Sequence, residues 1–179
     1  MPFIGIYAKE NDNNFIKNEL CKNSKNNKFE VFNINQKSLE NLKNVKFDIL
    51  IIKEDISNLI KKSNYIDNII KKATYIIVNN DIKNNKILLE QNINTITYGF
   101  NIKSNLTISS IKEDNILICV QNKIKDINEK IIEEQEVSIK IKKHNINKLY
   151  NIMAIFAILT IYGEKLWINK KYIINIKTL

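Results

Sequence analysis

The 179-residue sequence contains no arginine, one histidine, one proline and three glycines. Arginine supplies the planar fork that reads guanine edges and clamps phosphates, so its absence argues against sequence-specific nucleic-acid binding. A single histidine excludes a metal cluster or a catalytic triad built on repeated histidine. The few glycines and the single proline leave little room for long flexible linkers. A compact globular chain is therefore expected.

Cysteine and long apolar runs are also scarce. Cys21 and Cys119 lie far apart and match no metal-ligand spacing, so two reduced thiols are expected. The longest apolar run, residues 152–162, is shorter than the roughly 18 residues that a membrane span needs. Met1-Pro2 leads directly into a strand-like segment without the basic region of a signal peptide. These observations predict a cytoplasmic protein without a membrane span.

Lysine provides all of the positive charge, and the formal net charge is +9. The chain is rich in isoleucine, asparagine and lysine, as expected when an AT-rich genome sets codon usage, and we favour this explanation for the charge. The alternative is weak lysine-driven association with nucleic acid or an anionic membrane. Such binding would fall steeply with added salt and would show no sequence preference.

The first hundred residues alternate between short apolar segments and longer amphipathic ones. Near-continuous runs such as Phe47–Ile52 are typical of parallel strands that are covered on both faces. We expect strands at 3–8, 29–34, 47–52, 73–78 and 94–98. We expect helices at 14–22 and 82–91, one or two helices at 55–72, and a short helical or irregular stretch at 38–44. This alternation predicts an α/β fold with a mostly parallel sheet and helices on both faces.

The pattern changes after residue 100. Strand-like segments at 106–111, 115–121 and 136–141, with a short one at 131–132, follow one another without a long helix between them. Residues 147–163 then form an apolar helix with Gly163 at its C-cap, and the tail, 164–179, reads as either helix or strand.

We predict a single domain over residues 1–179. It consists of a parallel α/β part (1–100), a small antiparallel meander (101–143), and a buried helix with a C-terminal tail (144–179).

Four segments resemble, in order, those of a known family. They are Phe3–Ile6, Val78–Asp81, Ile96–Phe100 and Asn151–Gly163. Their counterparts are the opening strand I-G-I-T, the strand ending in N-x-D, the T-Y-G element and the N-A-L-A-A…G helix of the Mur ligase central domain. That family consists of ATP-dependent ligases that add amino acids to the muramyl precursor of peptidoglycan, with the folylpolyglutamate synthetases as relatives. The resemblance implies the family's central α/β fold.

The sequence departs from the family where the opening strand ends. The family continues into the phosphate loop G-T-N-G-K-T-T, and an ungapped alignment places Ala8–Asn14 on these positions. Both glycines are missing, Asp12 takes the place of the lysine, and Asn13 takes that of the magnesium-binding hydroxyl. A carboxylate next to a triphosphate adds repulsion on the order of a few kcal/mol. The chain therefore resembles a degenerate Mur ligase central domain without the loop, and we expect no ATP cofactor.

A few polar residues remain as candidates for ligand binding. Asp12 and Lys9 lie in the expected turn after the first strand, Asn79 and Asp81 follow a later strand, and His144-Asn145 resembles a shifted remnant of the motif that meets adenine in the family. The candidate set is Lys9, Asp12, Asn79, Asp81, His144, Asn145 and Asn151. A lone histidine in a polar turn is more often exposed and inert. We assign no catalytic residue and no metal ligand.

These features favour a non-catalytic, pseudoenzyme-like protein that binds or scaffolds in peptidoglycan precursor synthesis. One alternative is a small enzyme that binds a nucleotide or precursor in the strand-end cleft without a phosphate loop, using Asn79, Asp81 and Asn145. A second is the lysine-driven binder of anionic polymers. The expected partners are a second copy of the chain, because domains that flank the family's central domain have no counterpart in the sequence, or an enzyme of cell-wall synthesis.

Overall fold

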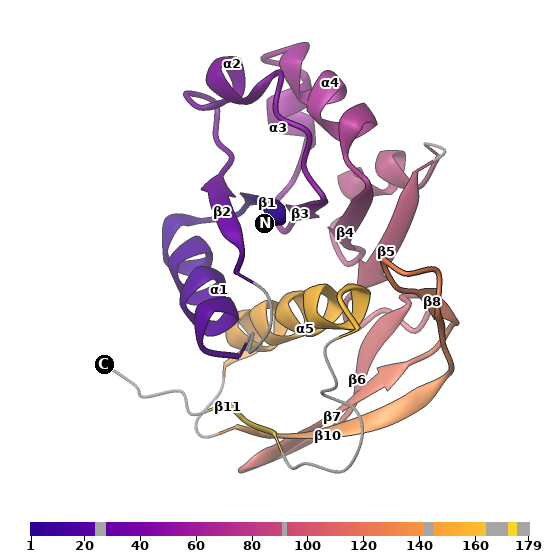
Figure 1. Ribbon diagram of the computed structural model, residues 1–179. Helices are drawn as coiled ribbons and strands as arrows, with labels where there is room; N and C mark the ends of the chain where they lie inside the picture. Colours follow the sequence, from indigo (N-terminus) through magenta and orange to yellow (C-terminus); the bar gives the residue numbers. More distant parts are fainter. Residues whose placement is uncertain (24–27, 91–92, 142–144, 164–171, 175–179) are drawn as a thin grey trace. The chain divides into compact units, whose positions relative to one another are not determined.

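The computed structural model describes residues 1–23, 28–90, 93–141, 145–163 and 172–174 (Figure 1). Its chain divides into two compact units, Met1–Thr97 and Tyr98–Leu179. The boundary falls close to residue 100, where the sequence pattern changes. The organisation of the chain as one domain stays a prediction.

The first unit alternates strands and helices as predicted. In chain order it contains β1 (Phe3–Tyr7), α1 (Glu10–Asn23), β2 (Glu30–Asn33), α2 (Leu39–Leu42), β3 (Ile49–Ile52), α3 (Ser57–Ile60), α4 (Tyr65–Lys72), β4 (Tyr75–Asn79), the 3-10 helix η1 (Lys83–Glu90) and β5 (Asn94–Tyr98), whose last residue lies beyond the unit boundary. The strand order is β5-β4-β3-β1-β2, and β1 pairs in parallel with both β2 and β3, as β3 does with β4. The predicted parallel sheet is therefore confirmed.

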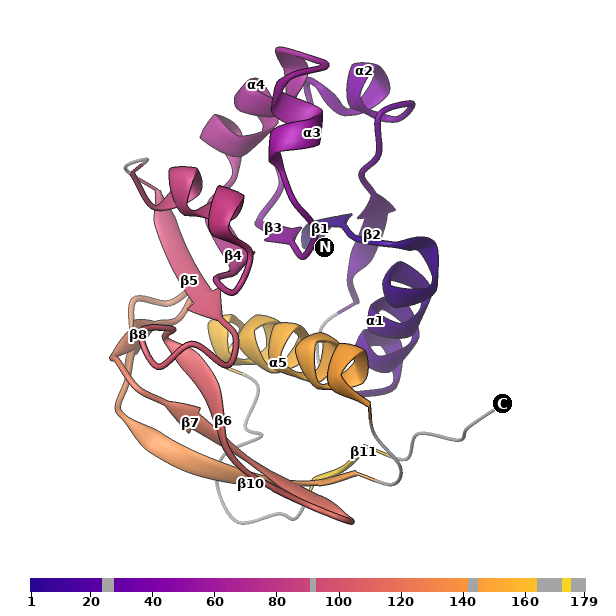
Figure 2. The same ribbon diagram turned by 180° about the vertical axis from the view of Figure 1, so that it is seen from behind.

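Helices cover both faces of this sheet. Leu50, Ile52 and Val78 point from β3 and β4 into one core with the apolar residues of α2, α3 and α4. In Figures 1 and 2, α1 lies on the opposite side of β1, β2 and β3 from these helices. The fully buried Ile16 and Leu20 of α1 close that second face. Burial on both faces explains why β3 and β4 read as continuous apolar runs.

Gly5 in β1 is required by close packing. A Cβ atom at this position would lie 2.7 Å from Cδ1 of Ile34 and 3.2 Å from side-chain carbons of Leu50 and Phe47. Real Cβ atoms essentially never come closer than 3.0 Å to another heavy atom, so an added side chain would have to displace the terminal methyl group of Ile34.

Two helices differ from the sequence-based expectation. Helix α1 begins at Glu10 rather than at residue 14, so the polar run that we expected to form a turn is helical. Segment η1 is a 3-10 helix rather than an α-helix. Residues 55–72 form two helices, α3 and α4, as one of the expected arrangements had it.

The second unit begins with the predicted meander. It contains β6 (Leu106–Lys112), β7 (Asn115–Val120), β8 (Ile124–Lys125), β9 (Ile131–Ile132), β10 (Gln135–Ile141), α5 (Ile146–Ile161) and β11 (Tyr172–Ile174). Strand β7 pairs antiparallel with β6 and β10, and β11 pairs in parallel with β10. Strands β8 and β9 form a separate hairpin, of which we had expected only the second strand. The antiparallel meander is confirmed.

Helix α5 is buried along most of its length, from Leu149 to Ile161. It ends at Ile161, and Gly163, two residues later, adopts φ +58° and donates its N–H to the carbonyl of Thr160 at 3.0 Å. This is the left-handed glycine at a helix C-terminus that was predicted. Within the tail, residues 172–174 form a strand, and the remainder lies outside the described residues. Among the helices that the structure describes, none has the length and apolarity of a membrane span.

Candidate functional site

The candidate site lies at the carboxyl ends of β1, β3 and β4 in the first unit. In the sheet, β1 lies between β2 on one side and β3 on the other. The chain therefore runs from β1 outward to β2 and then returns to the opposite side of β1 to form β3. This reversal of strand order is a topological switch point, and ligands of open α/β sheets bind outside the carboxyl ends of the strands at such points. The chemistry of this edge is therefore the best guide to what the first unit can bind.

Only two residues, Ala8 and Lys9, connect β1 to α1. The carbonyl oxygen of Lys9 accepts hydrogen bonds from the backbone N–H groups of Asp12 and Asn13, each at 3.0 Å. These two residues therefore belong to the first turn of a helix rather than to an open loop. A phosphate loop needs several residues between strand and helix whose N–H groups face the ligand, and this connection is too short to form one.

A buried ion pair occupies this edge of the sheet. Nζ of Lys53 lies 2.7 Å from Oδ2 of Asp12, and each side chain is only 4% exposed. Lys53 directly follows β3, and its backbone N–H donates to the carbonyl of Tyr7 at 3.0 Å, which holds it against the end of β1. Because the charges compensate each other in a desolvated place, removal of either partner leaves a buried charge without its counter-ion.

Asn13 joins the ends of β1 and β2. Its Nδ2 group donates to the carbonyl of Ala8 at 3.0 Å and to Oδ1 of Asn33 at 2.7 Å. Both partners are acceptors, so the orientation of the amide is fixed. Oδ1 of Asn13 is buried and has no hydrogen-bond partner among the described residues. The Asn13 side chain thus ties the ends of two strands together.

Asn79 and Asn85 join the ends of β3 and β4. Nδ2 of Asn79 donates to the carbonyl of Lys53 at 3.4 Å, and its Oδ1 accepts the N–H of Asp81 at 3.1 Å. Asn85 donates through Nδ2 to the carbonyl of Asn79 at 3.3 Å and accepts the N–H of Ile56 at 3.0 Å. Buried amide side chains therefore satisfy backbone groups at this edge.

Tyr7 and Asp55 form the outer part of the site. The hydroxyl of Tyr7 donates to the carbonyl of Asp55 at 3.2 Å. Burial raises the pKa of Tyr7, and the nearby carboxylates of Glu54 and Asp55 raise it further. Hydrogen bonds from Ser57 and Asn84 lower the pKa of the Asp55 carboxyl. Asp55 therefore organises the start of α3, whose first residue, Ser57, donates its backbone N–H to Oδ1 of Asp55 at 2.9 Å.

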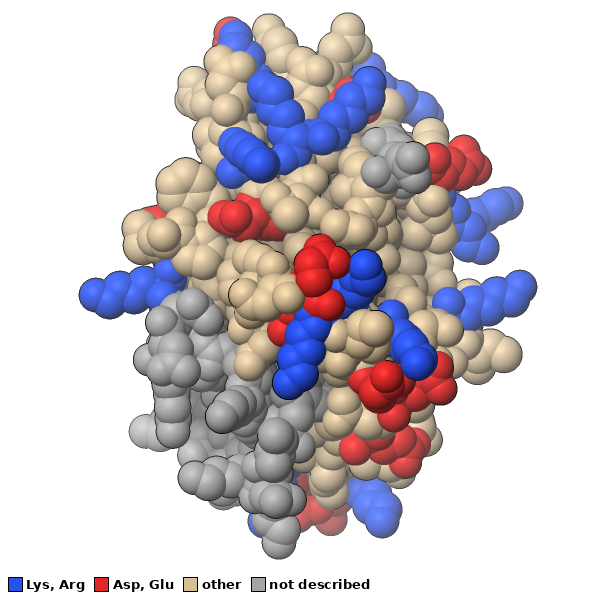
Figure 3. Space-filling view, turned by 45° about the vertical axis from the view of Figure 1, so that its right-hand side comes forward, with Lys and Arg blue, Asp and Glu red and all other residues tan. Residues whose placement is uncertain are grey.

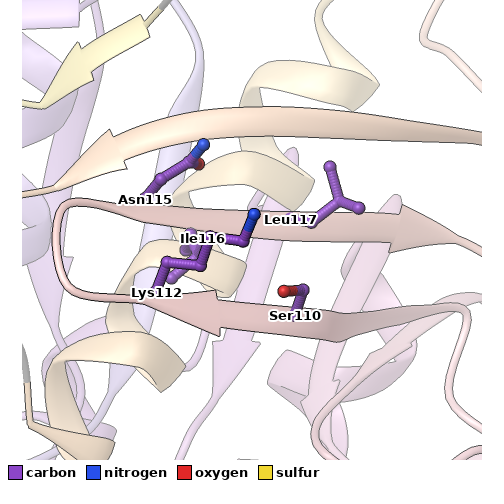
Figure 4. Close-up of a pocket in the computed structure, with 5 residues that line it drawn as sticks. All are labelled: Ser110, Lys112, Asn115, Ile116 and Leu117. Carbon is purple, nitrogen blue, oxygen red and sulfur yellow. The ribbon is translucent and has the colours of Figure 1, made fainter.

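Two surface depressions lie elsewhere. One of about 500 Å³ lies between α3 and η1 in the first unit. The other, of about 110 Å³, lies on the β6–β7 hairpin of the second unit, where Figure 4 shows Ser110 and Lys112 from β6 beside side chains of β7. Neither is lined by a residue of the Asp12–Lys53 pair. With only 4% of each side chain exposed, the ion pair is packed into the protein.

The structure brings four of the seven predicted residues to the strand ends of the first unit. They are Lys9, Asp12, Asn79 and Asp81. In the second unit Asn145 caps α5, with its Oδ1 accepting the N–H of Lys148 at 2.9 Å, and Asn151 is buried within the helix. His144 lies outside the described residues. Their roles in ligand binding stay predictions.

The sequence-based reasoning missed Lys53 as a partner of Asp12. A lysine directly after an uninterrupted apolar strand could have indicated a buried ion pair. The carbons of its side chain continue the buried segment, and its charge then needs a carboxylate partner. The two residues are 41 positions apart, however, and pairing them requires knowledge that β1 and β3 are neighbours.

Neither a protein-family model nor a curated protein matches the chain. Among the solved structures, MurF from Acinetobacter baumannii is similar to it, with a TM-score of 0.63 and 9% sequence identity. The match covers 92% of this chain and 44% of that MurF, so the chain spans less than half the length of that relative. At this identity the likeness shows the fold alone. The chain has a Mur-ligase-like α/β fold, as the four sequence segments had indicated.

Proposed function

We propose that this chain is a non-catalytic protein that uses a Mur-ligase-like fold for binding or scaffolding in the cytoplasmic synthesis of peptidoglycan precursors. The observation that carries this proposal is the buried Asp12–Lys53 ion pair at the switch point of the first unit. The structural likeness to a MurF supports the choice of pathway.

The ion pair opposes nucleotide binding at this edge through its charge. The ammonium of Lys53 lies 2.7 Å from a carboxylate of the protein, so a phosphate has to compete with that carboxylate. Asp12 would also repel a triphosphate, and the repulsion is strong because the side chain is desolvated. The two charges together leave no net positive charge for an incoming anion.

The backbone opposes nucleotide binding as well. Phosphate sites in α/β folds depend on free N–H groups at the start of the helix and on glycines that let the ligand approach. Here only two residues connect β1 to α1, and the sequence has no glycine between Gly5 and Gly99. An ATP-dependent ligation therefore lacks its usual phosphate cradle.

Isothermal titration calorimetry with Mg-ATP tests the loss of nucleotide binding. We expect no saturable heat at nucleotide concentrations around 1 mM, which corresponds to a binding free energy weaker than about −4 kcal/mol. The matched variant is Lys53→Met, which removes the cation but keeps the side-chain length. Binding by the unmodified chain with a Kd of about 1 mM or tighter, abolished in Lys53→Met, would overturn the proposal.

The scaffolding role needs a separate measurement. Purified chain is titrated with a MurF-type ligase and, in parallel, with a UDP-linked muramyl peptide, and binding is followed by calorimetry. We expect a saturable complex with one of them and no consumption of ATP by the chain alone. Absence of both interactions would remove the link to precursor synthesis, and ATP hydrolysis that depends on Asp12 or Lys53 would show that the chain is an enzyme.

A further inference from the structure

The positive charge of the chain is concentrated in the helices on one face of the first unit. We define the helical layer as residues 35–46 and 57–74, which contain α2, α3 and α4. Seven lysines and two carboxylates fall in this layer, which leaves +5 of the formal +9 on a small part of the chain. The lysines are Lys37, Lys43, Lys46, Lys61, Lys62, Lys71 and Lys72, and the carboxylates are Glu40 and Asp67. A compositional bias of the genome accounts for the total charge but not for this concentration.

The lysines of the helical layer are not held in salt bridges among the described residues, although Lys61 is near enough to Asp55, outside the layer, to help lower the pKa of that carboxyl. Six of them are exposed and Lys43 is half-buried, and none forms a salt bridge within the part of the chain that the structure describes. In Figure 3 lysine side chains gather at the top of the view, the level that α2–α4 occupy in Figure 1, whereas basic and acidic side chains alternate lower on the same face. The layer therefore presents a net positive charge, which attracts polyanions.

Contacts within the layer place an aromatic ring among these charges. Nζ of Lys43 lies 5.0 Å from the ring centroid of Tyr65, and Nζ of Lys72 donates to the carbonyl of Lys43 at 3.5 Å. Tyr65 is 37% exposed. A basic surface with an accessible ring is suited to single-stranded nucleic acid, because phosphates contact the lysines while a base stacks on the ring.

The same surface fits a membrane poorly. Helices that lie in the membrane interface bury a row of apolar side chains, and Tyr65 is the only large apolar residue of the layer that is clearly exposed.

Sequence-specific contact with nucleic acid is disfavoured as well, because the chain has no arginine, the side chain best suited to reading base edges. The chemistry therefore favours contact with the phosphate backbone.

We propose that the helical layer binds the phosphate backbone of single-stranded nucleic acid without sequence preference. This activity goes beyond the function proposed above and uses none of the residues at the strand ends. The layer is formed by helices on a face of the sheet, whereas the Asp12–Lys53 pair lies at the carboxyl ends of its strands. The two proposals therefore stand or fall separately.

Fluorescence anisotropy with a labelled oligothymidylate tests the proposal. The oligonucleotide has about 20 nucleotides, which is longer than one typical binding site for single-stranded DNA. The layer variant is Lys61→Gln, Lys62→Gln, Lys71→Gln and Lys72→Gln combined. The control removes the same total charge from exposed lysines outside the layer, Lys17, Lys103, Lys112 and Lys130, also replaced by glutamine. Circular dichroism checks that both proteins are folded.

We expect the layer variant to bind at least about tenfold more weakly than the unmodified chain at 50 mM salt, and the control to change it by less than about threefold. The dependence of affinity on salt should also become shallower in the layer variant alone. Tyr65→Ala should weaken binding by about fivefold or more if a base stacks on the ring. Equal losses in the two quadruple variants would overturn the proposal, as would a lack of binding at low salt. Tighter binding to phosphatidylserine vesicles than to the oligonucleotide would instead assign the layer to a membrane.

Discussion

The strand ends of the first unit and the β8–β9 hairpin of the second both hold lysine–carboxylate pairs, in very different surroundings. Lys53 and Asp12 lie 2.7 Å apart with 4% of each side chain exposed. Lys125 and Glu129 lie 3.1 Å apart with 64% and 72% exposed, and Lys123 and Glu133 are similarly open. Distances alone would rank these pairs as near equals.

The two kinds of pair contribute differently to stability because they differ in exposure to solvent. An exposed pair exchanges good hydration for a weak attraction and contributes little to stability. A buried pair has already lost its hydration, so each charge depends on the other. Most lysines of this chain can therefore serve as solubilising surface charge. Lys53 differs from them because its buried charge fixes the geometry of the strand ends.

Removal of one partner of the buried pair should have the largest effect. Lys53→Met leaves the Asp12 carboxylate buried without its ammonium, and we expect the free energy of unfolding to fall by about 3–5 kcal/mol. Lys125→Met is the matched control and should lower it by less than about 1 kcal/mol. Urea unfolding followed by circular dichroism measures both. A loss below about 1 kcal/mol at Lys53 would erase the contrast between the two regions.

Replacement of both partners should restore most of that loss. In Asp12→Leu combined with Lys53→Met no charge remains buried, and similar side-chain volumes fill the same space. We expect the double variant to recover roughly 2–4 kcal/mol relative to Lys53→Met alone. The same denaturation series measures the coupling between the two positions. If the two single losses simply add, the side chains do not form a coupled pair.

The ionisation of Tyr7 measures how strongly the strand ends of the first unit are desolvated. Its pKa is raised, so folding favours the neutral phenol, and this contribution is present below pH 10 and lost as pH rises through the folded-state pKa. Tyr7→Phe should remove the alkaline loss of stability and should cost about 1 kcal/mol near neutral pH through the lost hydrogen bond to Asp55. Absorbance at 295 nm during alkaline titration compares the two proteins. Ionisation of Tyr7 at or below pH 10 would contradict a desolvated site.

The exposed pairs of the β8–β9 hairpin should give the smallest effects. Glu129→Gln breaks the pair with Lys125, and we expect a change of at most about 0.5 kcal/mol at low salt, which disappears at 1 M sodium chloride. The buried pair should keep its contribution at that salt concentration. Thermal denaturation at the two salt concentrations checks this, and a large, salt-independent cost at Glu129 would show that exposure does not separate the regions.

Most of the fold was predictable because its strands are continuous apolar runs. β3, β4 and β5 were expected within two residues of their observed ends, and the meander and α5 were expected in the right order. The start of α1 was wrong because Glu10–Asn14 is rich in asparagine and aspartate, which favour turns in isolation. In the folded chain Asp12 and Asn13 gain tertiary partners, and these contacts outweigh their weak helix propensity.

The candidate site was only half predictable. Asp12 was chosen because an ungapped alignment places it on the lysine of the Mur ligase phosphate loop, and the strand ends were chosen because ligands of α/β sheets bind there. Whether these residues bind a ligand stays a prediction. Lys53 was missed because its partner comes from an element that only the strand order places beside it. The capping role of Asn145 was also missed, although an asparagine directly before an apolar helix is a common N-cap.

The central claim is that the chain's own ion pair takes the place of a nucleotide's phosphates at the end of β1. A crystal structure of the protein grown with excess Mg-ATP tests this most directly. We predict electron density for Nζ of Lys53 in contact with the Asp12 carboxylate, and none for a triphosphate between Ala8 and Asn14. A triphosphate bound there, with the ammonium of Lys53 turned away from Asp12 toward it, would contradict the account.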